Sequence, residues 1–314
     1  MHNFWYLYLP IAGNSVSIIL ILGMGLLVGI LSGIFGVGGG FLMTPILIMI
    51  GIPPTVAAAS DSNQIVGAST SGTIAHFRLG NVDLKMGILL LIGGVAGGTV
   101  GVQIIKILRQ LGNADFLINI TYVLMLGLIG GYMFQESLQA LRKSKQSNGE
   151  PAAAVSSEKS MFARILQKLP WQTDFPRSGV RLSILMPLVL GTFVGILAAI
   201  MGVGGGFIMV PVMVYILRMP MHVVVGTSLF QILFTCINVT VMQAYSNHTV
   251  DFVLALLLLL GSTVGAQLGA KISKRLKGDQ IKIFLSILVL LVMVKMLFGL
   301  LLTPHIMVSY FGGH

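Results

Sequence analysis

The sequence predicts an all-α polytopic membrane protein made of two inverted-topology repeats, each with about five helical elements. Three observations lead to this prediction: the composition, an internal repeat, and the placement of basic residues between apolar segments. The chain has 314 residues, of which 55% are hydrophobic and 9% are charged. A soluble domain carries about 25% charged residues. This chain cannot cover a water-facing surface, and we expect it to lie in a lipid bilayer.

Apolar runs that lack charges predict the helical elements. Two runs, 40–51 and 206–217, are too short to cross a hydrocarbon core of about 30 Å at roughly 1.5 Å per residue. We therefore expect them to be half-helices, one in each repeat, where a helix is broken at a GVGGG motif. The other predicted helices are 15–35, 55–77, 84–106, 115–138, 181–201, 221–245, 251–272 and 281–303.

A change of composition divides the chain in the middle. The run Arg142-Lys143-Ser144-Lys145 opens a polar stretch that predicts a soluble linker. Within it, 160–169 fits either a short amphipathic helix on the membrane surface or plain solvated chain. The predicted segments are an N-terminal interfacial segment (1–14), transmembrane repeat 1 (15–138), a cytoplasmic linker (139–180), transmembrane repeat 2 (181–303) and a C-terminal tail (304–314).

Two blocks of the first half recur in the second half. The block from Gly29 to Pro45 matches the block from Gly195 to Pro211 at a constant offset of 166. A second match begins at Asp83 and Asp251, each followed by small residues at the same spacings. Small residues three and four positions apart let helices pack closely in lipid. The two aspartates stand at predicted helix starts, where N-capping explains them.

The basic residues give the two halves an orientation. With the linker in the cytoplasm, 16 of the 19 Lys and Arg residues lie on the cytoplasmic side, only Lys106 and Arg109 lie outside, and Lys295 lies within the last apolar segment. This is the asymmetry of the positive-inside rule. Each half then holds an odd number of elements, so the halves are inverted, as in many secondary transporters. Both termini are predicted outside. One miscounted element would instead give a parallel-repeat channel or receptor.

Several classes of protein are excluded. The net charge of +10 does not indicate nucleic-acid binding, because the basic residues lie in the gaps between apolar runs. The single cysteine, Cys236, excludes an internal disulfide and a Cys-cluster metal site. The sequence has no HExxH, Walker or GxSxG motif. We expect no enzyme activity, no cofactor and no metal; the expected partners are a small anion and the bilayer, and the oligomeric state stays open, with a homodimer as one option.

The GVGGG runs at 36–40 and 202–206 are the candidate binding elements. Exposed backbone at membrane depth must be buried in protein or line a wet cavity. Each run precedes a short helix beginning near Phe41 or Phe207, whose first N–H groups lack helical partners and favour an anion. Inverted symmetry would aim both helix N-termini at one central site. The alternative is that the glycines only allow tight helix packing.

Polar residues in the next helix of each repeat complete the candidate site. The segment 60–64 is strongly polar within an apolar helix, and its counterpart is 226–231. Hydroxyl and amide groups can donate to an oxyanion without trapping it, although Ser and Thr often bond back to their own helix. The predicted substrate-binding residues are Gly38, Gly39, Gly40, Phe41, Ser62, Asn63, Gln64, Gly204, Gly205, Gly206, Phe207, Thr227, Ser228 and Gln231.

Asp61 is the candidate group for proton coupling. It is the acid placed deepest in an apolar segment, and an ionisable residue inside the membrane is a functional candidate by default. Beside an anion it would repel the substrate unless it were protonated. The alternative places Asp61 near the outer end of its helix as a solvated or capping group.

The paired GVGGGFxxxP blocks, the Ala-Ala-Ser-Asp and Gly-Thr-Ser segments after them, and the polar mid-chain linker resemble the TauE/SafE family of sulfite exporters. The resemblance covers about residues 15–303. It implies a secondary transporter of a small sulfur-containing anion, sulfite or an organosulfonate such as sulfoacetate, exported through a bacterial inner membrane. The alternatives are an anion channel of the same architecture and a membrane-embedded binding or assembly subunit that does not transport.

Overall fold

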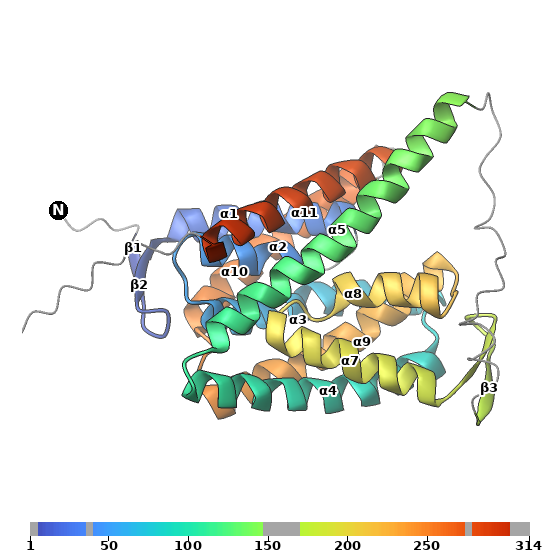
Figure 1. Ribbon diagram of the computed structural model, residues 1–314, viewed down its shortest axis with the longest axis horizontal. Coiled ribbons are helices and arrows are strands. Elements are labelled where there is room, and N and C mark those ends of the chain that lie inside the picture. The colour runs from blue at the N-terminus through green and yellow to red at the C-terminus, as the bar shows by residue number, and fades with distance from the viewer. Residues whose placement is uncertain (1–5, 36–39, 147–169, 274–277, 302–314) are drawn as a thin grey trace, which may run out of the picture.

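Helices form almost everywhere that the sequence has an apolar run, because backbone polar groups in a bilayer must be satisfied within their own segment. The computed structural model describes residues 6–35, 40–146, 170–273 and 278–301. Here the helices form one bundle with a two-stranded antiparallel hairpin at each end (Figure 1). In chain order the elements are β1 (Tyr6–Leu9), β2 (Asn14–Ser17), α1 (Ile18–Phe35), α2 (Gly40–Met49), α3 (Pro54–Arg78), α4 (Leu84–Gln110), α5 (Ala114–Gln146), β3 (Gln172–Phe175), β4 (Val180–Ser183), α7 (Leu185–Met201), α8 (Gly206–Pro211), the π-helix η1 (Val212–Ile216), α9 (Met221–Met242), the π-helix η2 (Gln243–Asn247), α10 (Phe252–Ser273) and α11 (Gly278–Leu301).

Length and composition make this a multi-pass helical membrane protein. Four helical stretches of the described residues are long and apolar enough to cross a membrane, and shorter apolar helices accompany them. Large hydrophobic side chains such as Leu128 and Phe252 are more than two-thirds exposed. Such a surface is suited to lipid rather than water. The four stretches are Leu84–Gln110, Ala114–Glu136, His222–Asn247 and Phe252–Gly269.

Two short hairpins accompany the helices, and the structure agrees with the predicted all-α class. Tyr6 pairs with Ser17 in the first hairpin, which begins in the predicted interfacial segment and ends in predicted repeat 1. Gln172 pairs with Ser183 in the second, which begins in the predicted linker and ends in predicted repeat 2. Helix α5 also continues past residue 139, where the linker was predicted to begin. The predicted amphipathic helix at 160–169 lies outside the described residues.

Helix α3 connects the two ends of the molecule. Near its start, the Asn14 side chain donates to the Gly51 carbonyl at 2.5 Å, which ties the β1–β2 hairpin to this end. Just after its last turn, Arg177 of the β3–β4 hairpin donates to the Gly80 carbonyl at 3.1 Å. We call these the β1–β2 end and the β3–β4 end. Helix α1 starts at the former and α7 at the latter, so the first helices of the two halves run in opposite directions (Figure 1).

Two helix pairs pack through glycines. A Cβ on Gly269 would stand 2.1 Å from the Ile30 carbonyl oxygen, so only glycine lets α10 lie this close to α1. In the same way, a Cβ on Gly97 would stand 2.0 Å from the Thr192 carbonyl oxygen, between α4 and α7. Contacts advance along both chains together, so the helices of each pair are parallel. The spacing of small residues predicted this close packing.

Asp83 and Asp251 fix the two ends in equivalent ways. The Asp83 carboxylate accepts the Met86 N–H at the start of α4, and the N–H and hydroxyl of Ser178 in the β3–β4 turn. The Asp251 carboxylate accepts the Leu254 N–H at the start of α10 and the Ile11 N–H in the β1–β2 turn. The predicted N-capping by both aspartates is confirmed.

These hydrogen bonds and glycine contacts organise the bundle into two groups of elements. One group holds β1–β2, α1, α3 and α10, and the other holds β3–β4, α4, α7 and α9. Each group mixes helices from both halves of the chain. The groups meet where α3 packs against α9, and α5 packs against α11 beside them.

Candidate functional site

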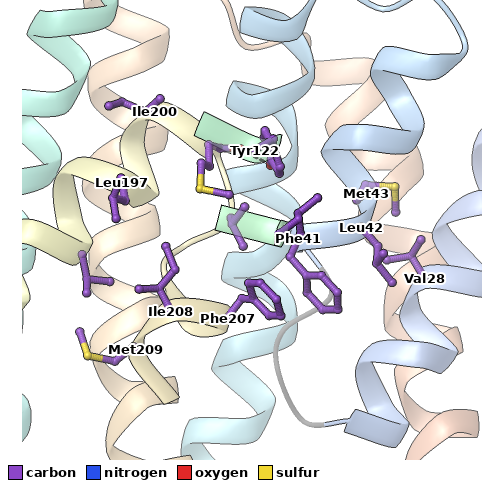
Figure 2. Packing of buried hydrophobic residues seen from close by; sticks show 14 of the residues in the cluster. Val28, Phe41, Leu42, Met43, Tyr122, Leu197, Ile200, Phe207, Ile208 and Met209 are labelled. Carbon is purple, nitrogen blue, oxygen red and sulfur yellow. Dashed lines mark hydrogen bonds between the residues drawn. The ribbon is translucent and has the colours of Figure 1, made fainter. Parts of the chain in front are cut away.

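Two short helices meet in the interior of the bundle. Phe41 is the second residue of α2 and Phe207 is the second residue of α8. Their rings are stacked, with centroids 4.5 Å apart and planes inclined by 10° (Figure 2). The two side chains are only 1% and 2% exposed. The helix starts at Gly40 and Gly206 therefore lie on either side of one buried aromatic contact.

The second glycine run separates α7 from α8 with a left-handed backbone. Helix α7 ends at Met201, and Gly202, Gly204 and Gly205 have φ of 72°, 68° and 78°. Residues with a side chain rarely adopt this conformation. Of the first run, Gly38 and Gly39 lie outside the described residues, while Gly40 opens α2.

Close packing also demands glycine in the second run. A Cβ on Gly202 would stand 2.0 Å from the Ala58 carbonyl oxygen, and one on Gly204 would stand 2.5 Å from Cys236 Sγ. The run is thus pressed between α3 and α9. This supports the alternative that the glycines serve packing, and it shows that α3 and α9 wall the region where α2 and α8 begin.

Asp61 of α3 stands beside the start of α2. It is fully buried, and Thr44 donates its hydroxyl to Asp61 Oδ2 at 2.8 Å. The same Oδ2 lies 3.2 Å from the point where a Cβ on Gly40 would be. The other oxygen, Oδ1, is buried without a hydrogen-bond partner among the described residues. The alternative that Asp61 is a solvated group at the helix end is therefore wrong.

Tyr122 of α5 completes this cluster. It is fully buried, its hydroxyl donates to the Met201 carbonyl at the end of α7, and it lies close to Thr44 and Asp61. Sequence reasoning did not find Tyr122 or Thr44. Both stand in apolar stretches, and Thr44 corresponds to Val210 in the repeat, so neither gave a signal in the sequence.

The other predicted residues of α3 differ in burial and in their hydrogen bonds. The Ser62 hydroxyl lies 3.1 Å from the Ala58 carbonyl of its own helix and 3.2 Å from the Gly202 carbonyl, so it joins α3 to the second glycine run. Gln64 is buried, and in the described part of the chain its Oε1 has no hydrogen-bond partner. Asn63 is half-buried.

The predicted residues of α9 are mostly engaged in holding helices. The Thr227 hydroxyl accepts the Asp83 N–H at 3.0 Å, which places it at the β3–β4 end. The Ser228 hydroxyl donates to the Val225 carbonyl of its own helix at 3.1 Å. Gln231 donates its amide to the Thr235 hydroxyl at 2.9 Å, and its buried Oε1 finds no partner in the described residues.

Three of the predicted site residues carry a buried oxygen without a hydrogen-bond partner in the described residues. Buried polar groups in proteins almost always have a hydrogen-bond partner, yet Asp61, Gln64 and Gln231 each keep an oxygen without one in the described structure. Each of these oxygens can still accept a hydrogen bond from a water molecule or a polar ligand, and the Asp61 carboxylate can also bind a proton. Across the described residues, no group of three or more His, Cys, Asp or Glu side chains could hold a metal ion.

Apolar spans, two short helices that meet in the interior and a buried acid define a polytopic helical membrane protein with polar groups at its centre. The chain belongs to the TauE/SafE sulfite exporter family, whose sequence profile, described as "Sulfite exporter TauE/SafE", matches residues 21–296. This confirms the resemblance drawn from the GVGGGFxxxP blocks.

Several relatives carry the name of a probable membrane transporter or of this family. The chain is 25% identical over 288 residues to "Probable membrane transporter protein YunE" of Bacillus subtilis (strain 168), covering 88% of this chain and 96% of that protein. It is 27% identical over 284 residues to "Probable membrane transporter protein YjnA" of the same organism, covering 90% and 100%. "Sulfite exporter TauE/SafE family protein 2" of Arabidopsis thaliana is 32% identical over 96 residues, covering 30% of this chain and 21% of that protein. No solved structure matches the chain.

Proposed function

We propose that this protein is a secondary transporter that exports a small sulfur-containing anion, sulfite or an organosulfonate such as sulfoacetate, across a bacterial inner membrane, with Asp61 as the proton-coupling group. The observation that carries the proposal is the meeting of α2 and α8 at the Phe41–Phe207 stack, directly beside the buried Asp61 carboxylate. Family membership and the names of the relatives support the transporter class and the kind of substrate.

Inverted repeats are part of this proposal. The opposite directions of α1 and α7, the parallel pairs α1–α10 and α4–α7, and the equivalent aspartates at the two ends support it. Each repeat would enter the membrane as a broken helix, α1 with α2 and α7 with α8. Inverted repeats that enclose a midplane site are the usual design of alternating-access transporters.

The starts of α2 and α8 would bind the anion. Free N–H groups at a helix start carry partial positive charge and attract anions, and α8 continues into η1, which lengthens the helical segment behind it. In the structure described here the stacked rings of Phe41 and Phe207 fill the space between the two starts. We therefore propose that the rings must separate before an anion binds.

The β3–β4 end would face the cytoplasm. Lys85, Arg177 and Arg181 gather there: Lys85 and Arg181 both contact Asp174 in β3, and Arg177 donates to the Gly80 and Val82 carbonyls. A surplus of basic residues marks the cytoplasmic side of a membrane protein. Transport from this end toward the β1–β2 end would be export.

The test is flux through the purified protein in liposomes. Sulfite movement is followed with an imposed pH gradient, with the reversed gradient, and with none, against protein-free liposomes as the control. We expect protein-dependent flux whose rate follows the gradient. Flux that ignores the gradient would contradict proton coupling and favour a channel.

The substrate is tested separately by thermal stabilisation. A ligand that binds only the folded protein stabilises it by about 2.7 kcal/mol at a hundred times its dissociation constant. Sulfite, sulfate, thiosulfate, sulfoacetate and taurine are compared at equal concentrations. We expect sulfite or sulfoacetate to raise the melting temperature most; if none of the five does so and none is transported, the proposed substrate class is wrong.

A further inference from the structure

A hollow of about 300 Å³ opens between α3 and α9. It lies toward the β3–β4 end, since Arg78, the last residue of α3, is one of its lining residues. Its walls are almost entirely apolar and include three aromatic rings. The lining includes Thr73, Phe77 and Arg78 of α3 and Phe230, Leu233 and Phe234 of α9.

The hollow faces away from the centre of the bundle. At about 3.6 residues per turn, Phe77 lies on roughly the opposite side of α3 from Asp61. Ile74 and Phe77 are 51% and 52% exposed, and Phe234 of α9 is 40% exposed. Exposed apolar side chains of a membrane protein meet the hydrocarbon of the bilayer. The hollow is therefore separate from the cluster around Asp61 and opens toward lipid.

Polar groups occur at two defined places in this apolar hollow. Thr73 is only 8% exposed, and its hydroxyl has no hydrogen-bond partner within the described ranges. Arg78 is exposed at the end of α3, where a guanidinium can reach the headgroup layer. A ligand that fits must therefore be mostly hydrocarbon, must accept a hydrogen bond from a hydroxyl, and must carry negative charge at one end.

We propose that the hollow binds an anionic phospholipid, with one acyl chain between α3 and α9 and the headgroup paired with Arg78. An ester oxygen of the lipid accepts the hydrogen bond of Thr73. A small anion does not suit the site, because its walls offer almost no polar surface. Because α3 and α9 belong to the two different groups of elements, the bound lipid stands at the seam between them.

The charge of Arg78 favours the lipid over a second copy of this chain. Across a two-fold dimer contact at this face, the Arg78 side chains of both copies would be brought onto the same apolar surface. An anionic headgroup instead neutralises the guanidinium, and basic pockets between helices at the membrane surface are suited to acidic headgroups. A single basic residue near the surface favours an anionic lipid by roughly fivefold.

Fluorescence quenching by brominated lipids tests the proposal on the full-length chain in vesicles. The two native tryptophans, Trp5 and Trp171, are replaced by Phe, and Phe77→Trp places one fluorophore in the hollow. Dibrominated phosphatidylglycerol and dibrominated phosphatidylcholine with the same acyl chains are titrated separately. We expect phosphatidylglycerol to bind roughly fivefold more tightly.

Two further variants separate the parts of the site. Arg78→Gln should bring the two lipids to equal affinity, while Arg181→Gln, which removes a charge at the same end of the molecule on β4, should leave the preference unchanged. Thr73→Val should weaken both lipids alike. Equal affinities in the parent, or a preference that survives Arg78→Gln, would overturn the proposal. Protection of the tryptophan from both lipids would also overturn it, because another protein surface would then cover the hollow.

Discussion

Helices α3 and α9 occupy equivalent places in the two halves, yet they carry different chemistry near the centre. Ser60 and Thr227 make equivalent hydrogen bonds: Ser60 accepts the Asp251 N–H at the start of α10, and Thr227 accepts the Asp83 N–H at the start of α4. This shared contact aligns Asp61 with Ser228. The repeat thus keeps the hydrogen bonds that hold helix ends together.

At the next position, Asp61 in α3 and Ser228 in α9, the two halves differ. Asp61 accepts the Thr44 hydroxyl and keeps one oxygen unpartnered among the described residues, whereas the Ser228 hydroxyl is satisfied by its own helix. Thr44 itself corresponds to Val210, which cannot donate a hydrogen bond. The first half therefore places an ionisable side chain at this position, and the second half does not. The two halves share their helix packing but differ in the side chains at the centre.

The largest expected effect follows from that asymmetry. Asp61→Asn keeps the size and the hydrogen bond from Thr44 but cannot exchange a proton, so we expect sulfite flux driven by a pH gradient to fall to the level of protein-free liposomes. Ser228→Ala, the matched change in the other half, should leave the flux within about twofold, because it removes one neutral hydrogen bond worth roughly 1 kcal/mol. Equal losses in both variants would show that the comparison is wrong.

In the second glycine run, an added Cβ would clash with backbone at Gly202 and with a side chain at Gly204. Gly202→Ala and Gly204→Ala should each destabilise the protein by about 2–5 kcal/mol, from the left-handed backbone and from overpacking. The clash at Gly204 is with the Cys236 side chain, while the clash at Gly202 is with the Ala58 backbone. Adding Cys236→Ala should therefore recover about 1–3 kcal/mol for Gly204→Ala and nothing for Gly202→Ala. Unfolding in mixed detergent measures both.

The sequence predicted the framework of the molecule because its signals are local. Charge-free runs located the helices, and the spacing of small residues located the close helix pairs. The offset of 166 placed Phe41 and Phe207 at equivalent positions, which the structure brings into contact. Asp83 and Asp251 were recognised as caps because an N-cap acts on residues only three positions away.

What the sequence could not predict depends on contacts between distant segments. Tyr122 and Thr44 join the Asp61 cluster only because α5 and α2 pack against α3. The hydrogen bonds of Thr227 with the Asp83 N–H and of Ser228 with its own helix were likewise not predicted, and substrate binding by these two residues stays a prediction. The hairpins were missed because each strand is only four residues long, too short for a clear alternating pattern.

A smaller effect is expected at the two capping aspartates. Asp83 accepts one more hydrogen bond than Asp251, from the Ser178 hydroxyl at 2.5 Å. A hydrogen bond to a charged group contributes about 1.5–3 kcal/mol, so Asp83→Ala should destabilise the protein more than Asp251→Ala by about that amount. In a Ser178→Ala background the two aspartate variants should become nearly equal. A difference that persists there would place its origin outside this hydrogen bond.

The smallest expected effect is the coupling between the two central rings. Phe41→Leu and Phe207→Leu keep most of the buried volume, so each should destabilise the protein by less than about 1.5 kcal/mol. Stacked aromatic pairs contribute about 0.5–1.5 kcal/mol beyond their burial, and the double variant should therefore be less destabilised than the sum of the single variants by that amount. A matched cycle on Phe230 and Phe234, whose rings meet edge to face at 5.1 Å outside the centre, gives the comparison. If the rings separate during transport, the coupling energy between Phe41 and Phe207 should change when a transported anion is added, while that between Phe230 and Phe234 should not. Unchanged coupling in both pairs would mean that the stack stays closed throughout.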